Sequence, residues 1–190
     1  MKPAPHLLVF DGFADWEPSY AVAELRRSGG HQLITIGYSG EPVVSMGGLC
    51  VLPDFDLAEV DFEHVRMLIL PGGDRWEREP LDETLLGLLH KLMAARTPIA
   101  AICGATLGVV RAGLHQGRKH TSNGLAYLKE HVPDYTAEGD YVNALAVRDR
   151  GLITASGLGA VEFAREIFAE LGVFSAEDRE KWYGLFKRGE

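Results

Sequence analysis

A single cysteine stands where an apolar run meets a predicted helix. Cys103 follows residues 99–102, which are all apolar, and Gly104 opens the helix after it. A strand that turns into a helix through one residue with small neighbours is the arrangement of a nucleophile elbow, whose strained backbone exposes a reactive side chain. Because the helix N-terminus would stabilise a thiolate, we expect a lowered thiol pKa. The alternative is a buried structural cysteine, which is the role expected of Cys50 in its plain strand context.

Two glycines follow another apolar run, at residues 65–70. Gly72 and Gly73 come directly after Pro71, and glycine leaves the backbone bare and free to adopt a positive φ. Beside a thiolate, N–H groups from such a turn would form an oxyanion hole. Taken alone, the glycine pair favours an ordinary turn at a strand end.

Three carboxylates surround an aromatic residue after the first apolar run. Asp11, Asp15 and Glu17 lie around Trp16, and Glu17 is at the start of a predicted helix. The helix dipole favours a carboxylate at that position without any function. If this loop folds over the elbow, however, Glu17 reaches Cys103. Near a thiolate and away from water its pKa would rise, and it would become a proton donor.

The other motifs are weaker. The seven histidines are scattered, and neither HExxH nor CxxC is present, so we predict no metal site and no cofactor. Residues 157–159, Gly-Leu-Gly, resemble the start of a dinucleotide-binding fingerprint, but a third glycine and a following strand are missing. Arg75, Trp76 and Arg78 could line a substrate mouth beside the glycine pair, although a solvated loop is the simpler interpretation.

These motifs need a scaffold that brings strand ends together. Apolar runs predict strands at residues 6–10, 32–36, 65–70, 98–102, 141–147 and 151–155, a short strand at 119–122, and a hairpin at 42–52. Helices are predicted at 17–28, 81–95, 104–112, 125–131, 160–171 and 175–186. The alternation indicates one α/β domain over residues 1–190, with a mostly parallel, doubly wound sheet. Sites in such sheets form at the carboxyl ends of the strands, where the three segments fall.

The composition narrows the classes of partner. The chain has 190 residues, 46% of them hydrophobic and 24% charged, and a net charge of −8. Nucleic acids and anionic membranes need a basic face, so neither is an expected partner. No apolar stretch is long enough to span a bilayer, and the N-terminus lacks the apolar region of a signal peptide. Since two cysteines make no disulfide framework, a cytoplasmic location is expected.

Taken together, the motifs resemble the ThiJ/PfpI family, within the class I glutamine amidotransferase-like fold. The resemblance rests on Glu17, the Pro-Gly-Gly at 71–73, the Ala-Ile-Cys-Gly at 101–104, and residues 118–123, 152–157 and 161–164. It implies a flavodoxin-like three-layer sandwich and a homodimer. It also implies that Cys103 is the nucleophile or redox centre, that Glu17 contacts it, and that N–H groups at Gly72, Gly73 and Gly104 form the oxyanion pocket.

The histidines depart from the family pattern. In the protease branch a histidine directly follows the cysteine, where this chain has Gly104, and in the deglycase and chaperone branch one lies near the position of Asn123. His120 is three residues earlier and is retained as a catalytic candidate, although an odd offset on an extended segment points to the opposite face. The alternative is a partly buried strand histidine. Residues 157–160 hold no histidine of the kind that glutaminases of this fold need, so glutamine hydrolysis is not expected.

The expected function is cysteine chemistry on a small molecule or a peptide. Cys103 would attack a carbonyl or amide carbon while Glu17 moves a proton. Amide hydrolysis, as in a protease, and glyoxalase- or deglycase-like chemistry both fit these residues. The alternatives are a redox or stress-response protein that uses oxidation of Cys103, and a chaperone-like binding module without catalysis.

Overall fold

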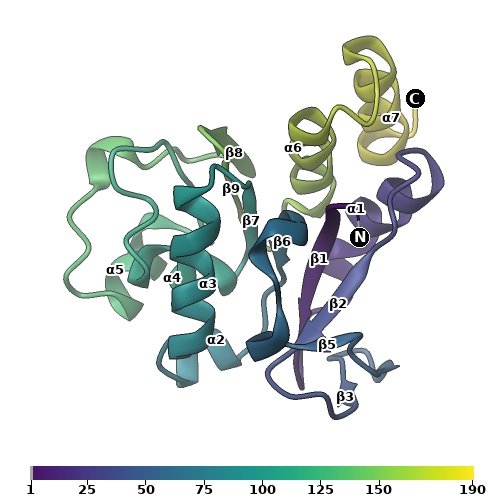
Figure 1. Ribbon diagram of the computed structural model, residues 1–190. Helices are drawn as coiled ribbons and strands as arrows, with labels where there is room; N and C mark the ends of the chain where they lie inside the picture. The colour runs from purple at the N-terminus through teal and green to yellow at the C-terminus, as the bar shows by residue number, and fades with distance from the viewer. Residues whose placement is uncertain (1) are drawn as a thin grey trace.

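A seven-stranded sheet, in the order β5-β2-β1-β6-β7-β9-β8, runs through the centre of the computed structural model, which describes residues 2–190 (Figure 1). Neighbouring strands are parallel, except that β8 is antiparallel to β9. The fold is therefore the predicted mostly parallel, flavodoxin-like α/β sandwich. The strands are β1 Ala4–Val9, β2 Ile34–Gly37, β5 Phe55–Asp56, β6 Val65–Leu70, β7 Ile99–Ile102, β8 Ala146–Asp149 and β9 Leu152–Ala155.

Helices lie on both sides of this sheet (Figure 1). One side carries α1 Trp16–Arg27, α6 Ala160–Leu171 and α7 Ala176–Arg188, and the other carries α2 Arg75–Arg78, α3 Glu83–Ala94, α4 Ala105–Arg111 and α5 Leu125–His131. Three short 3-10 helices connect the elements: η1 Leu57–Glu59, η2 Phe62–His64 and η3 Glu138–Asp140. Because both faces are covered, β7 and β9 are buried along their whole length, which explains their continuous apolar sequences.

The helix faces that the periodicity predicted do pack into the core. In α3 the buried stripe is Leu85, Leu88, Leu89 and Leu92, and in α6 it includes Phe163, Ile167 and Phe168. The hydroxyl of Ser175 accepts a hydrogen bond from the N–H of Asp178, so Ser175 caps α7 as expected. A smaller cluster of Leu107, Val110, Leu128 and Tyr135 joins α4 to α5 and the loop after it.

Several segments differ from the sequence prediction. The strand expected at residues 141–147 begins only at Ala146, as β8. Residues 119–122 form no regular strand, and a single bridge pairs His120 with Tyr141. The hydroxyl of Thr121 bonds to the carbonyl of Ala144, and that of Ser122 bonds to Thr106 of α4. The predicted solvated loop around Trp76 is instead the short helix α2. Trp76 is buried there because its indole packs on the core and its Nε1–H donates to the carbonyl of Pro71.

The predicted hairpin is present as β3 Val43–Val44 and β4 Cys50–Val51, a separate two-stranded sheet. Cys50 is exposed on it, so the expectation that this residue belongs to the core is wrong. The physical reason is the alternation of side chains in the hairpin: the pair Val43 and Val51 faces the core, so the next pair, Val44 and Cys50, faces solvent. Across residues 2–190, no helix combines the length and apolar character needed to cross a bilayer.

Candidate active site

Three segments that are distant in sequence meet at the carboxyl ends of β1, β6 and β7, as predicted. Gly72 lies between the other two: a Cβ built on it would be 2.7 Å from the Oε2 of Glu17 and 2.7 Å from the Cβ of Cys103. No side chain larger than hydrogen fits there. The close approach of Glu17 to Cys103 therefore depends on the glycine that follows Pro71.

Cys103 has the backbone conformation expected of an elbow. Its φ is +58°, a left-handed value that is uncommon for a residue with a Cβ. Its N–H donates to the carbonyl of Ala155 at 2.9 Å, and its carbonyl accepts from both the N–H and the hydroxyl of Thr106, at 3.1 and 2.6 Å. These bonds hold the strained turn between β7 and α4 and leave the side chain half-buried at the strand ends.

Glu17 faces the elbow from the first turn of α1. It is 1% exposed, its Oε2 accepts the N–H of Gly72 at 2.6 Å, and its carboxyl group hydrogen-bonds to the thiol of Cys103. Burial raises its pKa from 4.5 to about 7, against the lowering effect of those two hydrogen bonds. Its predicted position and the predicted rise in pKa are thus present in the structure. Gly72, by contrast, is no longer available as an oxyanion donor, because its N–H is already bonded to Glu17.

The loop that carries Glu17 is fastened to the β3–β4 hairpin. Asp11 accepts the N–H of Val44 at 2.8 Å, and Asp15 accepts the N–H of Gly47 at 3.0 Å. The N–H of Ala14 donates to the carbonyl of Gly72 at 3.0 Å. Asp11 and Asp15 therefore hold the loop in place, and Glu17 is the carboxylate that enters the site.

The Cys103 thiol differs from the expectation of a lowered pKa. Burial, followed by the negative charge of Glu17, raises its pKa to about 11, and the amide of Asn123 and the N–H of Gly104 counteract this in part. Burial and the charge of Glu17 therefore outweigh the helix N-terminus. Protonation of Glu17 removes the opposing charge. The two side chains consequently titrate as one coupled pair, in which the carboxylate can accept the thiol proton.

Asn123 is the site residue that sequence reasoning missed. Its Nδ2 donates to the Sγ of Cys103 at 3.3 Å, and its Oδ1 accepts the N–H of Gly157 at 2.9 Å. A Cβ on Gly157 would lie 3.0 Å from the same sulfur. Gly157 therefore packs against the thiol and does not begin a dinucleotide-binding turn. Its position in the sequence could have indicated this role, since Asn123 falls where one branch of the resembled family carries a histidine.

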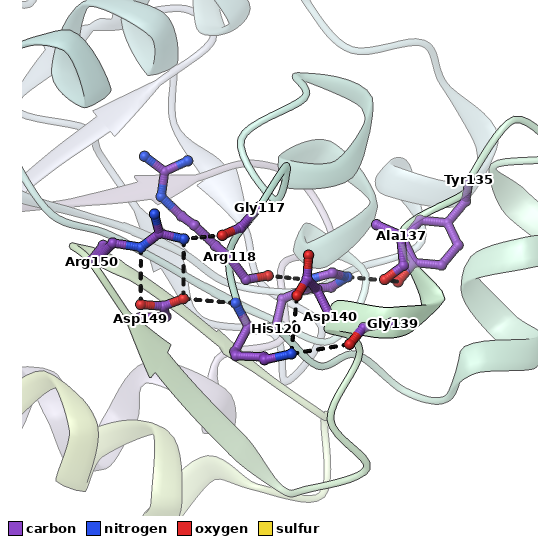
Figure 2. Close-up of polar contacts among 10 residues, drawn as sticks. Gly117, Arg118, His120, Tyr135, Ala137, Gly139, Asp140, Asp149 and Arg150 are labelled. Carbon is purple, nitrogen blue, oxygen red and sulfur yellow. Dashed lines mark hydrogen bonds and ion pairs between the residues drawn. The ribbon is translucent and has the colours of Figure 1, made fainter.

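His120, the predicted third catalytic residue, forms its hydrogen bonds with other residues than Cys103 and Glu17. It is 1% exposed, its Nδ1 contacts the carbonyl of Arg118 at 2.8 Å and its Nε2 contacts the Tyr135 hydroxyl at 2.7 Å (Figure 2). A carbonyl only accepts, so Nδ1 carries a proton in this arrangement. These bonds direct the ring toward Tyr135, whereas Asn123 bonds to the sulfur of Cys103.

A charged network fixes the segment that precedes His120 (Figure 2). Asp149 accepts the N–H of Lys119 at 2.8 Å and pairs with Arg150, whose guanidinium also donates to the carbonyl of Gly117. The ammonium of Lys119 bonds to Asp140 at 3.0 Å. His120 therefore serves to anchor residues 117–120, and the next residues carry Asn123 to the sulfur.

Two backbone donors remain near the thiol. The N–H of Gly104 interacts with the Cys103 sulfur. Gly73 has a φ of +148°, and its N–H bonds to no protein acceptor within residues 2–190. A Cβ on Gly104 would lie 3.1 Å from the carbonyl oxygen of Gly73, so the two glycines are adjacent. Together they can hold an oxygen that becomes negative next to the sulfur. In the same residue range, no three histidine, cysteine or acidic side chains are grouped to hold a metal ion.

Comparison with known proteins finds similarity over most of the chain. The model of the DJ-1/PfpI family matches residues 6–170. The chain is 38% identical to the Bacillus subtilis protein named uncharacterized protease YoaZ, over 96% of this chain and 90% of that protein. It is 28% identical to a deglycase of Thermococcus kodakarensis, over 78% and 87% of the two chains. The crystal structure of a ThiJ/PfpI family protein from Bacillus anthracis superimposes with a TM-score of 0.91 at 36% identity, covering 100% of this chain and 92% of the other.

Proposed function

The chain belongs to the DJ-1/PfpI family, and we propose that it is a cysteine-dependent enzyme in which Cys103 attacks the carbonyl carbon of a small molecule. The observation that carries this proposal is the contact between the Cys103 thiol, held at a strained elbow, and the buried carboxyl group of Glu17. A carboxyl group with a pKa of about 7 exchanges protons readily at neutral pH.

The addition step uses the groups already in place. As the sulfur of Cys103 forms a bond to the carbonyl carbon, Glu17 takes the thiol proton and the carbonyl π electrons move to the oxygen. The N–H groups of Gly73 and Gly104 hold that oxygen, which then receives the proton from Glu17. The product is a hemithioacetal, and Glu17 returns to its carboxylate form.

An α-oxoaldehyde adduct can react further with the same carboxylate. Glu17 would remove the proton from the carbon bonded to sulfur and return it to the neighbouring carbon. The hydroxyl proton on the first carbon would pass to the neighbouring carbonyl oxygen, so that the hemithioacetal becomes the thioester of a 2-hydroxy acid. Water would then cleave the thioester, releasing a 2-hydroxy acid and the free thiol of Cys103. This sequence belongs to glyoxalase- and deglycase-like chemistry, and one relative is named a deglycase.

Amide or peptide hydrolysis is the second candidate, favoured by the relative named a protease. This reaction expels an amine, which must be protonated, and histidine does this in cysteine proteases. Both ring nitrogens of His120 are engaged by Arg118 and Tyr135, so Glu17 would have to supply the proton. Carbonyl addition makes no such demand and fits this site better.

Oxidation of the thiol is a further use of the same geometry. A peroxide would convert Cys103 to a sulfenic acid and be reduced to water. The new oxygen would find donors in the amide of Asn123, the N–H of Gly104 and protonated Glu17. A redox role therefore needs the same residues but no carbonyl substrate.

Turnover measurements separate these functions. We expect the wild-type chain and Cys50→Ser to convert methylglyoxal to lactate, and Cys103→Ser and Glu17→Gln to lose this activity. Fluorogenic amides, tested in parallel, report on hydrolysis, and intact mass after peroxide reports on oxidation. Equal turnover by wild type and Cys103→Ser, or no turnover of methylglyoxal by either, would refute the proposed carbonyl chemistry.

A further inference from the structure

The side chain of Asn123 bridges two loops at the strand ends. Its Oδ1 accepts the N–H of Gly157 at 2.9 Å, and its Nδ2 donates to the Sγ of Cys103 at 3.3 Å. A backbone N–H only donates, so the amide oxygen must face Gly157 and the amide nitrogen must face the sulfur. The protein itself therefore sets which end of the amide the thiol meets.

The two residues before Asn123 are held by hydrogen bonds of their side chains. Thr121 donates its hydroxyl proton to the carbonyl of Ala144 at 2.8 Å, and the hydroxyls of Ser122 and Thr106 lie 2.6 Å apart. Thr106 is also bonded to the carbonyl of Cys103. Asn123 is therefore tied to the elbow through its neighbour as well as through its own amide.

A second residue, Tyr127, contacts the amide of Asn123. Tyr127 of α5 receives a hydrogen bond from Asn123 and donates its own hydroxyl proton to Glu77 at 2.8 Å. Burial and the bond to Glu77 raise the pKa of Tyr127, so its hydroxyl stays protonated. The chain of contacts from Glu77 through Tyr127 to Asn123 supports the amide.

An amide donor has a defined chemical consequence at this position. It bonds more strongly to a sulfur that carries negative charge than to a neutral thiol. Unlike a histidine, it neither takes up nor releases a proton in the physiological range. Among residues 2–190, proton exchange with the sulfur therefore falls to Glu17, the ionisable side chain hydrogen-bonded to it.

We propose that Asn123 is a catalytic residue that directly contacts the reacting sulfur and stabilises the thiolate of Cys103 with a hydrogen bond from its oriented amide. The inference rests on the proposed role of Cys103 as the nucleophile. The two neighbours of the sulfur then have different roles: Asn123 stabilises the negative charge of the thiolate, and Glu17 accepts the thiol proton.

The test measures alkylation of Cys103 by iodoacetamide against pH, in a Cys50→Ser background that removes the exposed thiol. Asn123→Ala deletes the donor, and we expect the rate at pH 8 to fall about tenfold, the value of one hydrogen bond to a charged group. Asn123→Asp keeps the acceptor for Gly157 but puts a negative charge beside the sulfur. We expect a larger fall, and an upward shift of the step in the profile that Glu17 causes near pH 7.

Asn143→Ala, at an exposed position in the loop before β8, is the matched control and should react at the parent rate. Parent-like rates in both Asn123 variants would overturn the proposal. If the alanine variant folds poorly, the aspartate variant decides, because it retains the bond to Gly157. A failure of the proposed function can be told apart from a failure of this inference. Undiminished methylglyoxal turnover in Cys103→Ser would refute the function, whereas the alkylation rates test only the effect of Asn123 on the sulfur.

Discussion

The carboxyl group of Glu17 hydrogen-bonds to the thiol of Cys103 in a buried contact that glycine makes possible. Burial raises the pKa of both groups, and the negative charge of Glu17 adds to the rise at Cys103. Since each group affects the other, the pair exchanges protons in two shared steps. The properties of the site follow from this pair more than from either residue alone.

Replacing Glu17 should change the form of the alkylation profile of Cys103. With the pair intact, we expect one step near pH 7, where Glu17 becomes able to accept the thiol proton, and another near pH 11. Glu17→Gln removes the carboxylate charge, so the profile should show a single step below pH 11. Iodoacetamide rates from pH 5 to 11 measure this, with Glu177→Gln on the exposed side of α7 as control. A two-step profile in Glu17→Gln would contradict the assignment.

The stability of the fold should depend on the ionisation of Glu17. Its folded pKa of about 7 is above its ordinary value of 4.5, so the neutral form is favoured by folding. This contribution is fully present below pH 4.5 and is lost as the pH rises through 7. The shift corresponds to about 3 kcal/mol. Urea denaturation of the wild type and Glu17→Gln at pH 5 and pH 8 should show the wild type losing more stability on going to pH 8. Equal losses would mean that Glu17 titrates normally.

A methyl group at Gly72 should separate the pair. Gly72→Ala places a Cβ 2.7 Å from both Glu17 and Cys103, and the structure must shift to relieve the overlap. We expect a loss of about 1–3 kcal/mol in stability and a changed alkylation profile of Cys103. Gly87→Ala on α3 is the matched control, because a Cβ there meets nothing within 4 Å. This control should be slightly stabilising, as alanine is the better helix former. Unchanged thiol reactivity in Gly72→Ala would argue against the contact.

The two cysteines should be kinetically distinct. Cys50 is exposed on β4, whereas Cys103 is half-buried beside a carboxylate. We expect a disulfide reagent such as DTNB at pH 8 to react in a fast phase and a slow phase of equal size. Cys50→Ser should remove the fast phase and Cys103→Ser the slow one. A fast phase that survives in Cys50→Ser would show the Cys103 thiol to be more accessible than the structure has it.

Local sequence patterns predicted the scaffold and two members of the site. Small residues around Cys103 and the glycines after Pro71 indicate a tight strand-to-helix turn and a close approach, because both depend on short-range sterics. That Glu17 reaches the thiol was conditional on the path of its loop. This path is determined by bonds from Asp11 and Asp15 to a hairpin about thirty residues away in sequence.

The residues that sequence reasoning misplaced lie in segments whose path depends on contacts with distant parts of the chain. Periodicity indicates which side a side chain takes on a regular strand, but residues 119–123 follow an irregular path set by contacts to several other loops. Asn123 thus reaches the sulfur and His120 does not. Likewise Cys50 has a strand-like sequence, and its exposure follows from the register of the hairpin, in which Val43 and Val51 take the face toward the core.

The left-handed backbone at Cys103 lowers the stability of the fold while it exposes the reactive thiol. A residue with a Cβ at a φ of +58° is strained by about 1 kcal/mol relative to glycine. Cys103→Gly should therefore yield a chain that has no nucleophile and yet resists heat better than Cys103→Ala. Random drift toward greater stability would replace the cysteine, so keeping the thiol at this position requires continuous selection for what the sulfur does.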